Sequence, residues 1–529
     1  MTSNEIKILI SMSLYMLGII GIGLFFMKRA NKNSENYFLG GRSLGPWVAA
    51  MSAEASDMSG WLLMGLPGVA YFTGIADAAW TAIGLALGTY INWLIVAKRL
   101  RRYSSITNDA ITLPDFFSSR YHESKKVIMT ISSLFILIFF TVYASSCFVT
   151  CGKLFSKLFG TSYQSMMILG AIFVIVYTFL GGFLAESVSD FVQAFVMIFA
   201  LSAILVLGVV NAGGIASVVT NAQAIDGFFN FFTTASPSLD TDGVQQVANG
   251  AALFGEPATY GFLTIISTMS WGLGYFGMPQ VLLRFMAIRK AEELKKSRRI
   301  ATVWVLISLF CAVSIGVIGR ILFPAETSLL TSSGAENIFV VLSQSLLPPL
   351  LAGIVMAGIL AATISSSDSY LLIAASAFSK NIYQSILKRD ATDKQVMKIS
   401  RIILIVISVI GMIIALDENS VIFKVVSFAW AGFGATFGPL LLFSLFWRRT
   451  TKEGAIAGML SGGIMVFFWN LIVKPFGKSI GGTLGGVLGI YELLPAFLIS
   501  CAFIIIFSLL SKGPSGEIIK EFELARKKD

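Results

Sequence analysis

Long apolar stretches recur along the whole chain and restrict what it can fold into. Each is about 20 residues long, the length that a helix needs to cross the ~30 Å hydrocarbon core of a bilayer. Only helices and closed barrels satisfy every backbone hydrogen bond there. We interpret thirteen segments as spans: 7–27, 46–70, 77–97, 127–152, 162–182, 189–211, 260–283, 301–323, 338–376, 399–416, 421–446, 453–473 and 485–510. The sequence therefore predicts an all-α polytopic membrane protein, with a ninth span long enough to include a cytoplasmic extension.

The composition agrees with this interpretation. Of 529 residues, 56% are hydrophobic and 13% are charged. A soluble domain averages roughly 45–50% apolar residues and about 25% charged residues. The net charge of +10 does not indicate nucleic-acid binding, because Lys and Arg separate the apolar runs instead of forming one basic domain. Residues 7–27 are too long for the apolar part of a signal peptide, and no small-residue cleavage site follows.

Basic residues between the spans set the expected orientation, because Lys and Arg gather in cytoplasmic loops. The loops at 28–43, 98–126 and 284–300 are rich in them, whereas 212–258 contains none. Basic and non-basic loops continue to alternate in the second half of the chain. The basic residues there are Lys380, Lys388, Arg389, Arg448, Arg449, Lys520, Arg526, Lys527 and Lys528. We expect a cell-membrane protein with its N-terminus outside and its C-terminus in the cytoplasm. The loop at 183–188 has no basic residue and is too short to carry much signal.

Several function classes find little support. Only His122 and four cysteines are available as soft metal ligands, and Cys147 and Cys151, one helical turn apart, fit packing better than metal binding. An enzyme would need a nucleophile–base pair, and none is evident. A sensor would need an appended signalling domain, and none is evident either. A channel does not as a rule pair broken helices. The outer loop is the longest hydrophilic stretch, and Phe228, Phe229, Phe231 and Phe232 predict a short helix resting on the protein or on the membrane interface.

Polar residues within spans are costly, about 2.5–3.5 kcal/mol for a charge at the bilayer centre. Between residues 54 and 60 the second span contains Glu54, Ser56, Asp57, Ser59 and Gly60. This composition suits a helix whose hydrogen bonding is interrupted and whose free carbonyls, with hydroxyls and a carboxylate, bind a hard monovalent cation. The alternative is a buried polar network that only joins helices.

The ninth span and the start of the sixth contain further polar groups. In the ninth, Ser365 and Ser369 share a helix face, with Ser366 and Asp368 beside them. Helix packing through small residues explains one or two of these but less well so many hydroxyls with a carboxylate. Asp190 opens the sixth span as either a cation ligand or a helix N-cap.

The seventh span contains a second interruption. Three glycines and Pro279 fall between residues 272 and 279, which predicts a broken helix lining a cavity. Trp271 and Tyr275 lie one turn apart and form an apolar wall with polar tips. A kinked helix with aromatic packing is the alternative.

The two interruptions lie five spans apart, as expected for a five-plus-five inverted repeat. Broken helices at matching positions of two repeats indicate a transport site. The expected single transporter domain, 1–529, then divides into an extra helix, two repeats, two further helices and a cytoplasmic tail: 7–27, 46–211, 260–446, 453–510 and 511–529.

Motifs across nearly the whole chain support this. The runs YFLGGR at 37–42, AEASDMSGWLLMGLP at 53–67, WGLGYFGMP at 271–279 and VSFAWAGFGATFGP at 426–439 resemble the sodium/solute symporter family, most closely its proline-transporting branch. The resemblance implies a leucine-transporter-like core of ten helices with flanking helices, sodium as the co-transported ion, and L-proline or a similar zwitterion as substrate. No protein partner beyond the lipid bilayer is indicated.

The resemblance also implies roles for particular residues. Sodium ligands are expected at the carbonyls of Ala55, Met58 and Ala362 and the hydroxyls of Ser365 and Ser366. Asp57 would support this site electrostatically, and Arg42 would act in coupling on the cytoplasmic side. The expected substrate residues are Ser59, Gly60, Trp61, Tyr143, Trp271, Tyr275 and Pro279.

One departure from the family pattern leaves the number of ions open. Some members bind a second sodium ion at the positions of Asp190 and Ser369, but Asp368 stands where a neutral residue is expected. Asp368 would strengthen a second cation site, carry a proton or pair with a basic side chain. Another amino acid, a vitamin acid or a sugar remains the alternative substrate. A sugar is disfavoured because the pocket segments lack the Asn, Gln and Glu residues that bind many hydroxyls.

Overall fold

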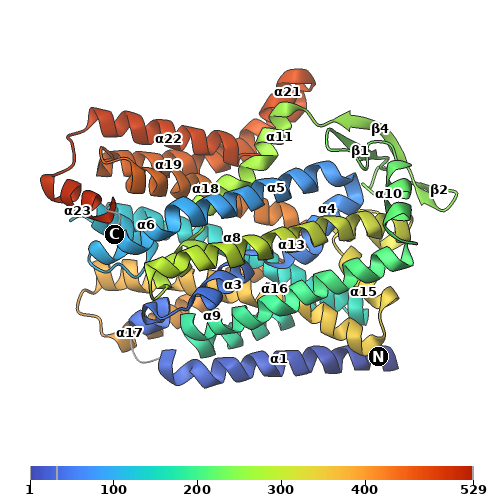
Figure 1. Ribbon diagram of the computed structural model, residues 1–529, viewed down its shortest axis with the longest axis horizontal. Coiled ribbons are helices and arrows are strands. Elements are labelled where there is room, and N and C mark those ends of the chain that lie inside the picture. Colours follow the sequence, from blue (N-terminus) through green and yellow to red (C-terminus); the bar gives the residue numbers. More distant parts are fainter. Residues whose placement is uncertain (1, 31–33, 527–529) are drawn as a thin grey trace.

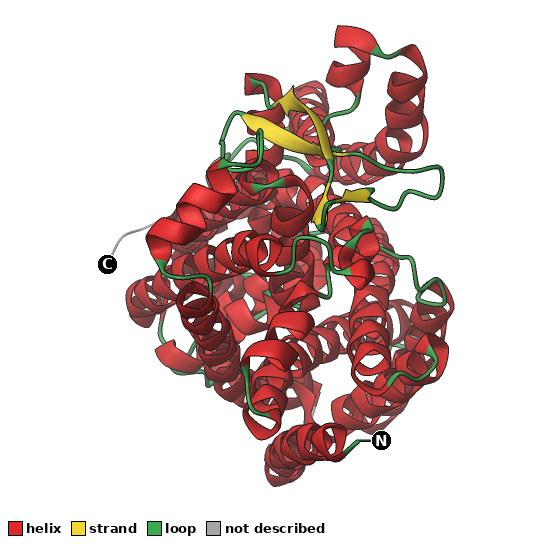
Figure 2. Cartoon of the chain, turned by 90° about the vertical axis from the view of Figure 1, so that its right-hand side faces the viewer, coloured by secondary structure: helices red, strands yellow, loops and turns green. Residues whose placement is uncertain are grey.

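A computed structural model describes residues 2–30 and 34–526, and helices dominate it (Figure 1). Ten helical segments in this described part are long and apolar enough to cross a membrane: Ser3–Phe26, Ile75–Ile106, Val127–Phe159, Gly182–Asn211, Ala291–Leu322, Pro349–Leu387, Asp393–Ile414, Ile422–Phe446, Lys452–Ile480 and Leu493–Leu510. Shorter apolar helices lie at Trp61–Thr73, Tyr163–Phe179 and Phe262–Phe276. Seen from the end that carries the strands, most helices run along the line of sight (Figure 2).

The first half of the chain supplies most of one side of the core. Its helices are α1 (Ser3–Ala30), α2 (Ser34–Leu39), α3 (Pro46–Asp57), α4 (Leu66–Thr73), α5 (Ile75–Ile91), α6 (Ala97–Ile106), α7 (Leu113–Arg120), α8 (Val127–Phe159), α9 (Tyr163–Asn211) and α10 (Ile215–Gln223). Short 3₁₀ or π segments, η1 (Gly40–Arg42), η2 (Trp61–Gly65) and η3 (Asn92–Val96), join several of them.

The second half continues after the strands. Its helices are α11 (Phe262–Met269), α12 (Pro279–Ala287), α13 (Leu294–Leu322), α14 (Ser332–Ala335), α15 (Ile338–Leu346), α16 (Pro349–Ser376), α17 (Asp393–Ile414), α18 (Ile422–Phe446), α19 (Lys452–Phe468), α20 (Lys474–Ile480), α21 (Gly482–Leu488), α22 (Leu493–Leu510) and α23 (Gly516–Arg526). Its 3₁₀ or π segments are η4 (Ser270–Phe276), η5 (Ala291–Glu293), η6 (Thr327–Leu329), η7 (Ala377–Leu387) and η8 (Trp469–Val473). Helices α16 and α18 are the most enclosed spans, whereas α1, α17 and α19 lie at the periphery.

Two small antiparallel strand pairs accompany the predicted all-α core. Strand β1 (Thr233–Pro237) pairs antiparallel with β4 (Phe254–Thr259), and β2 (Val247–Ala248) with β3 (Ala251–Ala252). Asn249 and Gly250 join β2 to β3, both with positive φ, as a tight two-residue hairpin turn requires. The short helix expected at Phe228–Phe232 is wrong: the helix here is α10, and the phenylalanines follow it.

Three boundaries differ from the prediction. The loop expected at 183–188 is helical, because the direction of α9 changes earlier, at Gly182, whose φ of 59° suits glycine. The ninth span is two helices, since Pro348 and Pro349 separate α15 from α16. The tail after residue 511 contains α23, whose Phe522 is buried against Tyr103.

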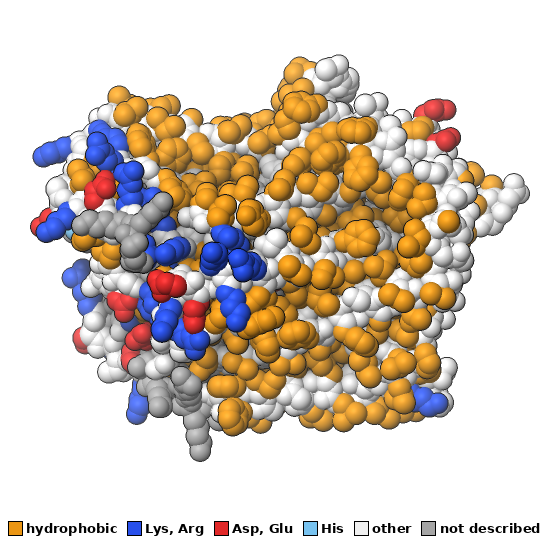
Figure 3. All heavy atoms as spheres, viewed as in Figure 1, with side chains coloured by type: hydrophobic (Ala, Val, Ile, Leu, Met, Phe, Trp, Pro, Cys, Tyr) orange, Lys and Arg blue, Asp and Glu red, His pale blue; other side chains and the backbone are white. Residues whose placement is uncertain are grey.

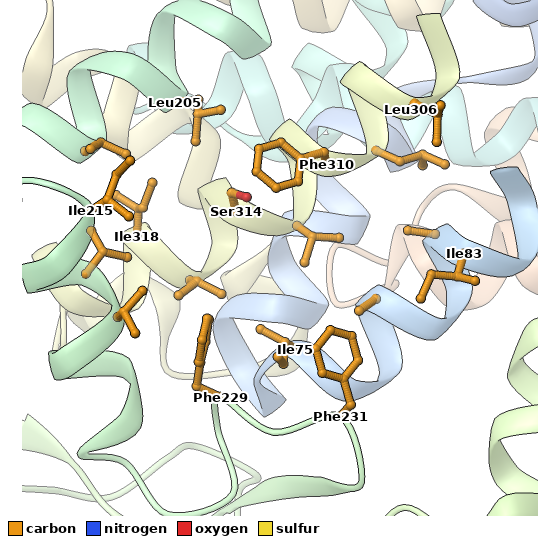
Figure 4. A pocket seen from close by; sticks show the side chains of 18 of the residues that line it. Ile75, Ile83, Leu205, Ile215, Phe229, Phe231, Leu306, Phe310, Ser314 and Ile318 are labelled. Atoms are coloured by element: carbon orange, nitrogen blue, oxygen red, sulfur yellow. The ribbon is translucent and has the colours of Figure 1, made fainter. Parts of the chain in front are cut away.

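The surface shows how the molecule meets a membrane. Lys and Arg side chains gather at the end that carries α6, α23 and the C-terminus, and a broad apolar surface covers the middle (Figure 3). Between α5, α9 and α13 this surface forms an apolar groove of about 720 Å³, whose lining also includes Ile215 of α10 and Phe229 (Figure 4). A soluble monomer rarely exposes so large an apolar surface, so lipid chains are its natural surroundings.

Candidate functional site

Helix α3 ends inside the protein, and its end defines the centre of the candidate site. The last residue, Asp57, is followed by Met58, whose φ and ψ of −84° and 75° are not helical. The Ser59 amide donates to Asp57 instead of Ala55, which frees the Ala55 carbonyl from the helical pattern. Gly60 is required at the break because a Cβ there would lie 2.3 Å from Thr150 Oγ1. The expected interruption of the second span is therefore present.

Helix α16 covers this break with hydroxyl groups. Ser365 Oγ lies 2.8 Å from the Ala55 carbonyl oxygen and 3.2 Å from that of Ala362, and Ser366 Oγ lies 3.3 Å from the Ala55 oxygen. All of these residues are fully buried. Four of the five predicted sodium ligands thus share one small volume, and Met58 lies at the break itself. Neutral carbonyl and hydroxyl oxygens of this kind are ligands for a hard cation.

The seventh span is interrupted as predicted. Helix α11 passes into the 3₁₀ segment η4, and helix geometry is lost at Met278 before Pro279 starts α12. Glycines permit close packing here: a Cβ on Gly272 would lie 2.2 Å from the Gly84 carbonyl oxygen, and one on Gly274 1.9 Å from Trp430 Nε1. The break is therefore enclosed by protein, which is the condition for irregular backbone at membrane depth.

The Asp57 carboxylate joins the two breaks. Tyr275 Oη donates to its Oδ2 at 2.8 Å, and Gln280 Nε2 donates to its Oδ1 at 3.3 Å. Tyr275 belongs to η4 and Gln280 to α12, so both donors come from the second broken helix. Gln280 was missed by the sequence analysis, although it directly follows Pro279.

Aromatic side chains enclose the other predicted substrate residues. The Trp61 and Trp271 rings are 6.1 Å apart, and Trp271 also contacts Trp430 and Phe423. Tyr143 stacks on Tyr370 at 4.3 Å. The Ser59 hydroxyl is buried without a hydrogen-bond partner among the described residues, so this polar atom is available to a bound solute.

A second polar cluster lies beside the first, and its centre is an arginine that the sequence analysis placed in a loop. Arg284 is fully buried within α12. Its Nη2 forms an ion pair with Glu186 and lies 3.1 Å from Asp190 Oδ2 and 2.9 Å from Ser369 Oγ. Its Nε donates to Ser52 Oγ at 3.0 Å. The sequence analysis counted Arg284 together with the basic loop residues that follow at 289–299, so its position inside a helix was missed.

Asp190 is part of this cluster, and Asp368 lines a small cavity together with Glu186. Asp190 lies within α9 and not at its start, so the N-cap alternative is wrong. Asp190 and Ser369, both named for a possible second cation, contact the Arg284 guanidinium. Asp368 Oδ1 accepts from the Ser369 amide at 2.8 Å, while its Oδ2 is buried without a partner among the described residues.

Arg42 lies away from these clusters, at the basic end of the protein. Its Nη1 donates to the Met286 carbonyl at 2.7 Å, and its Nη2 donates to the Ala110 carbonyl and pairs with Asp109, both at 2.9 Å. Burial lowers the pKa of Arg42, and Asp109 opposes this shift. Arg42 thus ties the last turn of α12 to the loop between α6 and α7.

Comparisons with known proteins identify the relatives of this chain. The profile described as "Sodium:solute symporter family" matches residues 37–462. The Escherichia coli K12 protein named sodium/proline symporter is 40% identical over 97% of this chain and 95% of its own length. Proteins of the same name from Staphylococcus aureus USA300/TCH1516 and Haemophilus influenzae Rd are both 39% identical over 98% of this chain, and over 95% and 97% of their own lengths.

Solved structures share the fold at low sequence identity. A Na⁺-coupled sialic acid symporter in a substrate-bound outward-open state matches with a TM-score of 0.75 at 18% identity, over 96% of this chain and 99% of its own. MhsT, solved with L-phenylalanine, matches with a TM-score of 0.50 at 14% identity, over 87% of this chain and 97% of its own. The leucine-transporter-like fold predicted from the sequence is thereby confirmed.

Proposed function

Because the chain belongs to the sodium:solute symporter family and is a transporter, not an enzyme, we propose that it couples sodium entry to uptake of L-proline across the cell membrane. The observation that carries this proposal is the Asp57 carboxylate, which receives hydrogen bonds from the second broken helix while the first break lies beside the Ser365 and Ser366 hydroxyls. The Asp57 carboxylate thus lies at the first break, beside the oxygen-lined ion position, and contacts the second broken helix directly.

The proposed sodium position lies between α3 and α16. Its ligands are the carbonyls of Ala55, Met58 and Ala362 and the hydroxyls of Ser365 and Ser366. Asp57 provides negative charge nearby without direct ligation. The Arg284 guanidinium is held by Glu186, Asp190 and Ser369, so we assign one sodium ion to each transport cycle.

Neighbouring serines provide a matched test of the ion position. Ser365→Ala is expected to weaken half-maximal activation by sodium about tenfold or more, because it removes a proposed ligand. Ser367→Ala is the control, since the Ser367 hydroxyl is equally buried but bonds to Thr363 in its own helix. The sodium dependence of uptake measures both variants. Equal sodium activation of Ser365→Ala and wild type would remove Ser365 from the site.

The substrate position is proposed at the two breaks. Amide groups near Ser59 and Gly60 would bind the proline carboxylate, and Trp61, Trp271 and Tyr143 would contain the pyrrolidine ring. Tyr275 and Pro279 complete the position from the second broken helix. L-Proline is chosen because the relatives named sodium/proline symporter match almost the whole chain.

We propose alternating access as the mechanism. Sodium stabilises the arrangement that admits substrate from outside, and closure then exposes both ligands to the cytoplasm. Arg42 would act in this second step, because it holds α12 to the loop between α6 and α7. One charge moving through 100 mV supplies ~2.3 kcal/mol, enough for roughly 40–50-fold accumulation at ~1.4 kcal/mol per decade.

Uptake of labelled L-proline into proteoliposomes tests the substrate. We expect accumulation only with an inward sodium gradient, and competition by unlabelled proline but not by sugars, vitamin acids or other amino acids. Sodium-driven uptake of one of these competitors, with no uptake of proline, would show that the protein is a sodium symporter for a different substrate.

The proposed orientation has the N-terminus outside and the C-terminus in the cytoplasm. The basic end in Figure 3 carries α23 and the C-terminus, which supports this assignment. Lys32, Lys527 and Lys528, counted in the sequence argument, lie outside the described residues. In a chain without native cysteines, Ser3→Cys should react with an impermeant maleimide in intact cells and Ser515→Cys only after permeabilisation. The reverse pattern would contradict the orientation.

A further inference from the structure

A polar cavity of about 530 Å³ lies at the end of the protein that carries the strands and meets the η4 segment of the broken seventh span at Trp271. Asp77 and Lys474 provide its charges, and Trp271, Phe423, Tyr491 and Tyr260 provide aromatic walls. This volume falls within the range of small-ligand pockets. The cavity therefore combines an acidic group, a basic group and apolar faces in a space sufficient for an amino acid and several waters.

Asp77 is held in place but keeps accepting capacity. It is half-buried in the first turn of α5. Its Oδ1 accepts a hydrogen bond from Tyr260 Oη at 2.9 Å, and Tyr260 Oη also lies 2.5 Å from Thr268 Oγ1. Oδ2 has no hydrogen-bond donor among the described residues. A carboxylate in this setting fits the ammonium group of a solute.

Lys474 keeps donating capacity in the same way. Its Nζ pairs with Glu492 and lies 5.9 Å from the centre of the Tyr491 ring. An ammonium group has three donors, so donors remain for the carboxylate of a solute. Tyr491 is fixed by its amide, which donates to Ser267 Oγ at 2.7 Å. Helix α11, through Ser267 and Thr268, thus connects the walls that carry Lys474 and Asp77.

Trp271 connects this cavity to the transport path. Its ring stacks on Tyr491 at 5.3 Å in the cavity wall and lies 6.1 Å from the Trp61 ring beside the first break. The Trp271 side chain is buried between the two. A solute in the cavity is therefore separated from the first break by an aromatic layer that includes Trp271.

From these features we infer that the cavity is a second, outer binding site for a zwitterionic amino acid, with Asp77 for its ammonium group and Lys474 for its carboxylate. This inference rests on the proposed function, since the occupant is the transported solute before it passes Trp271. The site binds weakly, because Glu492 already neutralises part of the Lys474 charge and both groups are partly hydrated.

Equilibrium dialysis of the detergent-purified protein with labelled L-proline in saturating sodium tests this inference. Wild type is expected to bind two molecules, one tightly and one at least about tenfold more weakly. Asp77→Asn and Lys474→Met should lose the weak component and keep the tight one. In proteoliposomes the same variants should raise KM several-fold with little change in kcat.

Two controls separate ligand binding from structural damage. Lys478→Met removes an exposed charge one turn further along α20, and Glu256→Gln removes an exposed charge in β4. Both should retain two binding components.

Each outcome decides between the two proposals. A single class of site in wild type that nonetheless transports proline would overturn the outer site and leave the proposed function intact. Loss of the weak component in Lys478→Met or Glu256→Gln as well would show that the loss is not specific to Asp77 and Lys474, and would also overturn the outer site. Absence of both binding and sodium-driven uptake for proline and other zwitterionic amino acids would overturn the proposed function and the outer site together.

Discussion

Replacing Asp57 with Asn is expected to reduce sodium-driven proline uptake at least about 100-fold. Two unit charges ~5 Å apart interact by about 3 kcal/mol at an effective dielectric constant of about 20, and each ~1.4 kcal/mol is a factor of ten. The substitution keeps the size of the side chain and an acceptor for Tyr275, so the loss is mainly one of charge. Initial uptake rates across a sodium titration measure the effect.

Tyr275→Phe is the control for this prediction. It removes the 2.8 Å hydrogen bond to Asp57 but keeps the carboxylate, so uptake should remain sodium-dependent with a reduction of about tenfold or less. Asp57→Asn with sodium dependence and uptake within a few-fold of wild type would show that the carboxylate is not needed for coupling.

Replacing Arg284 with Met is expected to destabilise the protein by about 3–5 kcal/mol, the usual cost of removing one partner from a buried ion pair. Glu186 and Asp190 would both lose their ion pair with Arg284. Arg284→Lys should rescue little, because a single ammonium group cannot replace the fork that also reaches Ser52 and Ser369. Thermal unfolding of the detergent-purified variants measures the loss.

Two further variants make this second prediction decisive. Arg299→Met, on the exposed surface of α13, should unfold within a degree or two of wild type. The triple variant Arg284→Met, Glu186→Gln and Asp190→Asn should recover most of the lost stability, because it also neutralises both carboxylates that pair with Arg284. Wild-type stability in Arg284→Met alone would contradict the account of this cluster.

The breaks were predictable because their causes are local. Glycines and Pro279 interrupt the seventh span by themselves, and the row of carboxylates and hydroxyls from Glu54 to Ser59 is too polar for an ordinary span. The hydroxyls on α16 were visible from their spacing. Their convergence on the Ala55 carbonyl was implied by the family resemblance, because contacts between residues about 310 positions apart leave no local pattern.

The Arg284 cluster was not predictable in the same way. Arg284 precedes a run of loop arginines and lysines, and a count of loop charge treats all of them alike. The usable signal was the pair Glu186 and Asp190, two acidic residues one turn apart beside an apolar run, which calls for a buried cation. The Asn249–Gly250 turn was a second missed signal, obscured by the assumption that membrane proteins of this composition contain helices alone.

Simultaneous flux of ²²Na⁺ and L-proline into proteoliposomes tests the central claim most directly. The account predicts that external proline accelerates ²²Na⁺ entry, with one sodium ion entering for each proline, and that Asp57→Asn abolishes this acceleration. Sodium entry that is indifferent to proline, in vesicles that accumulate proline, would contradict coupling through the two broken helices.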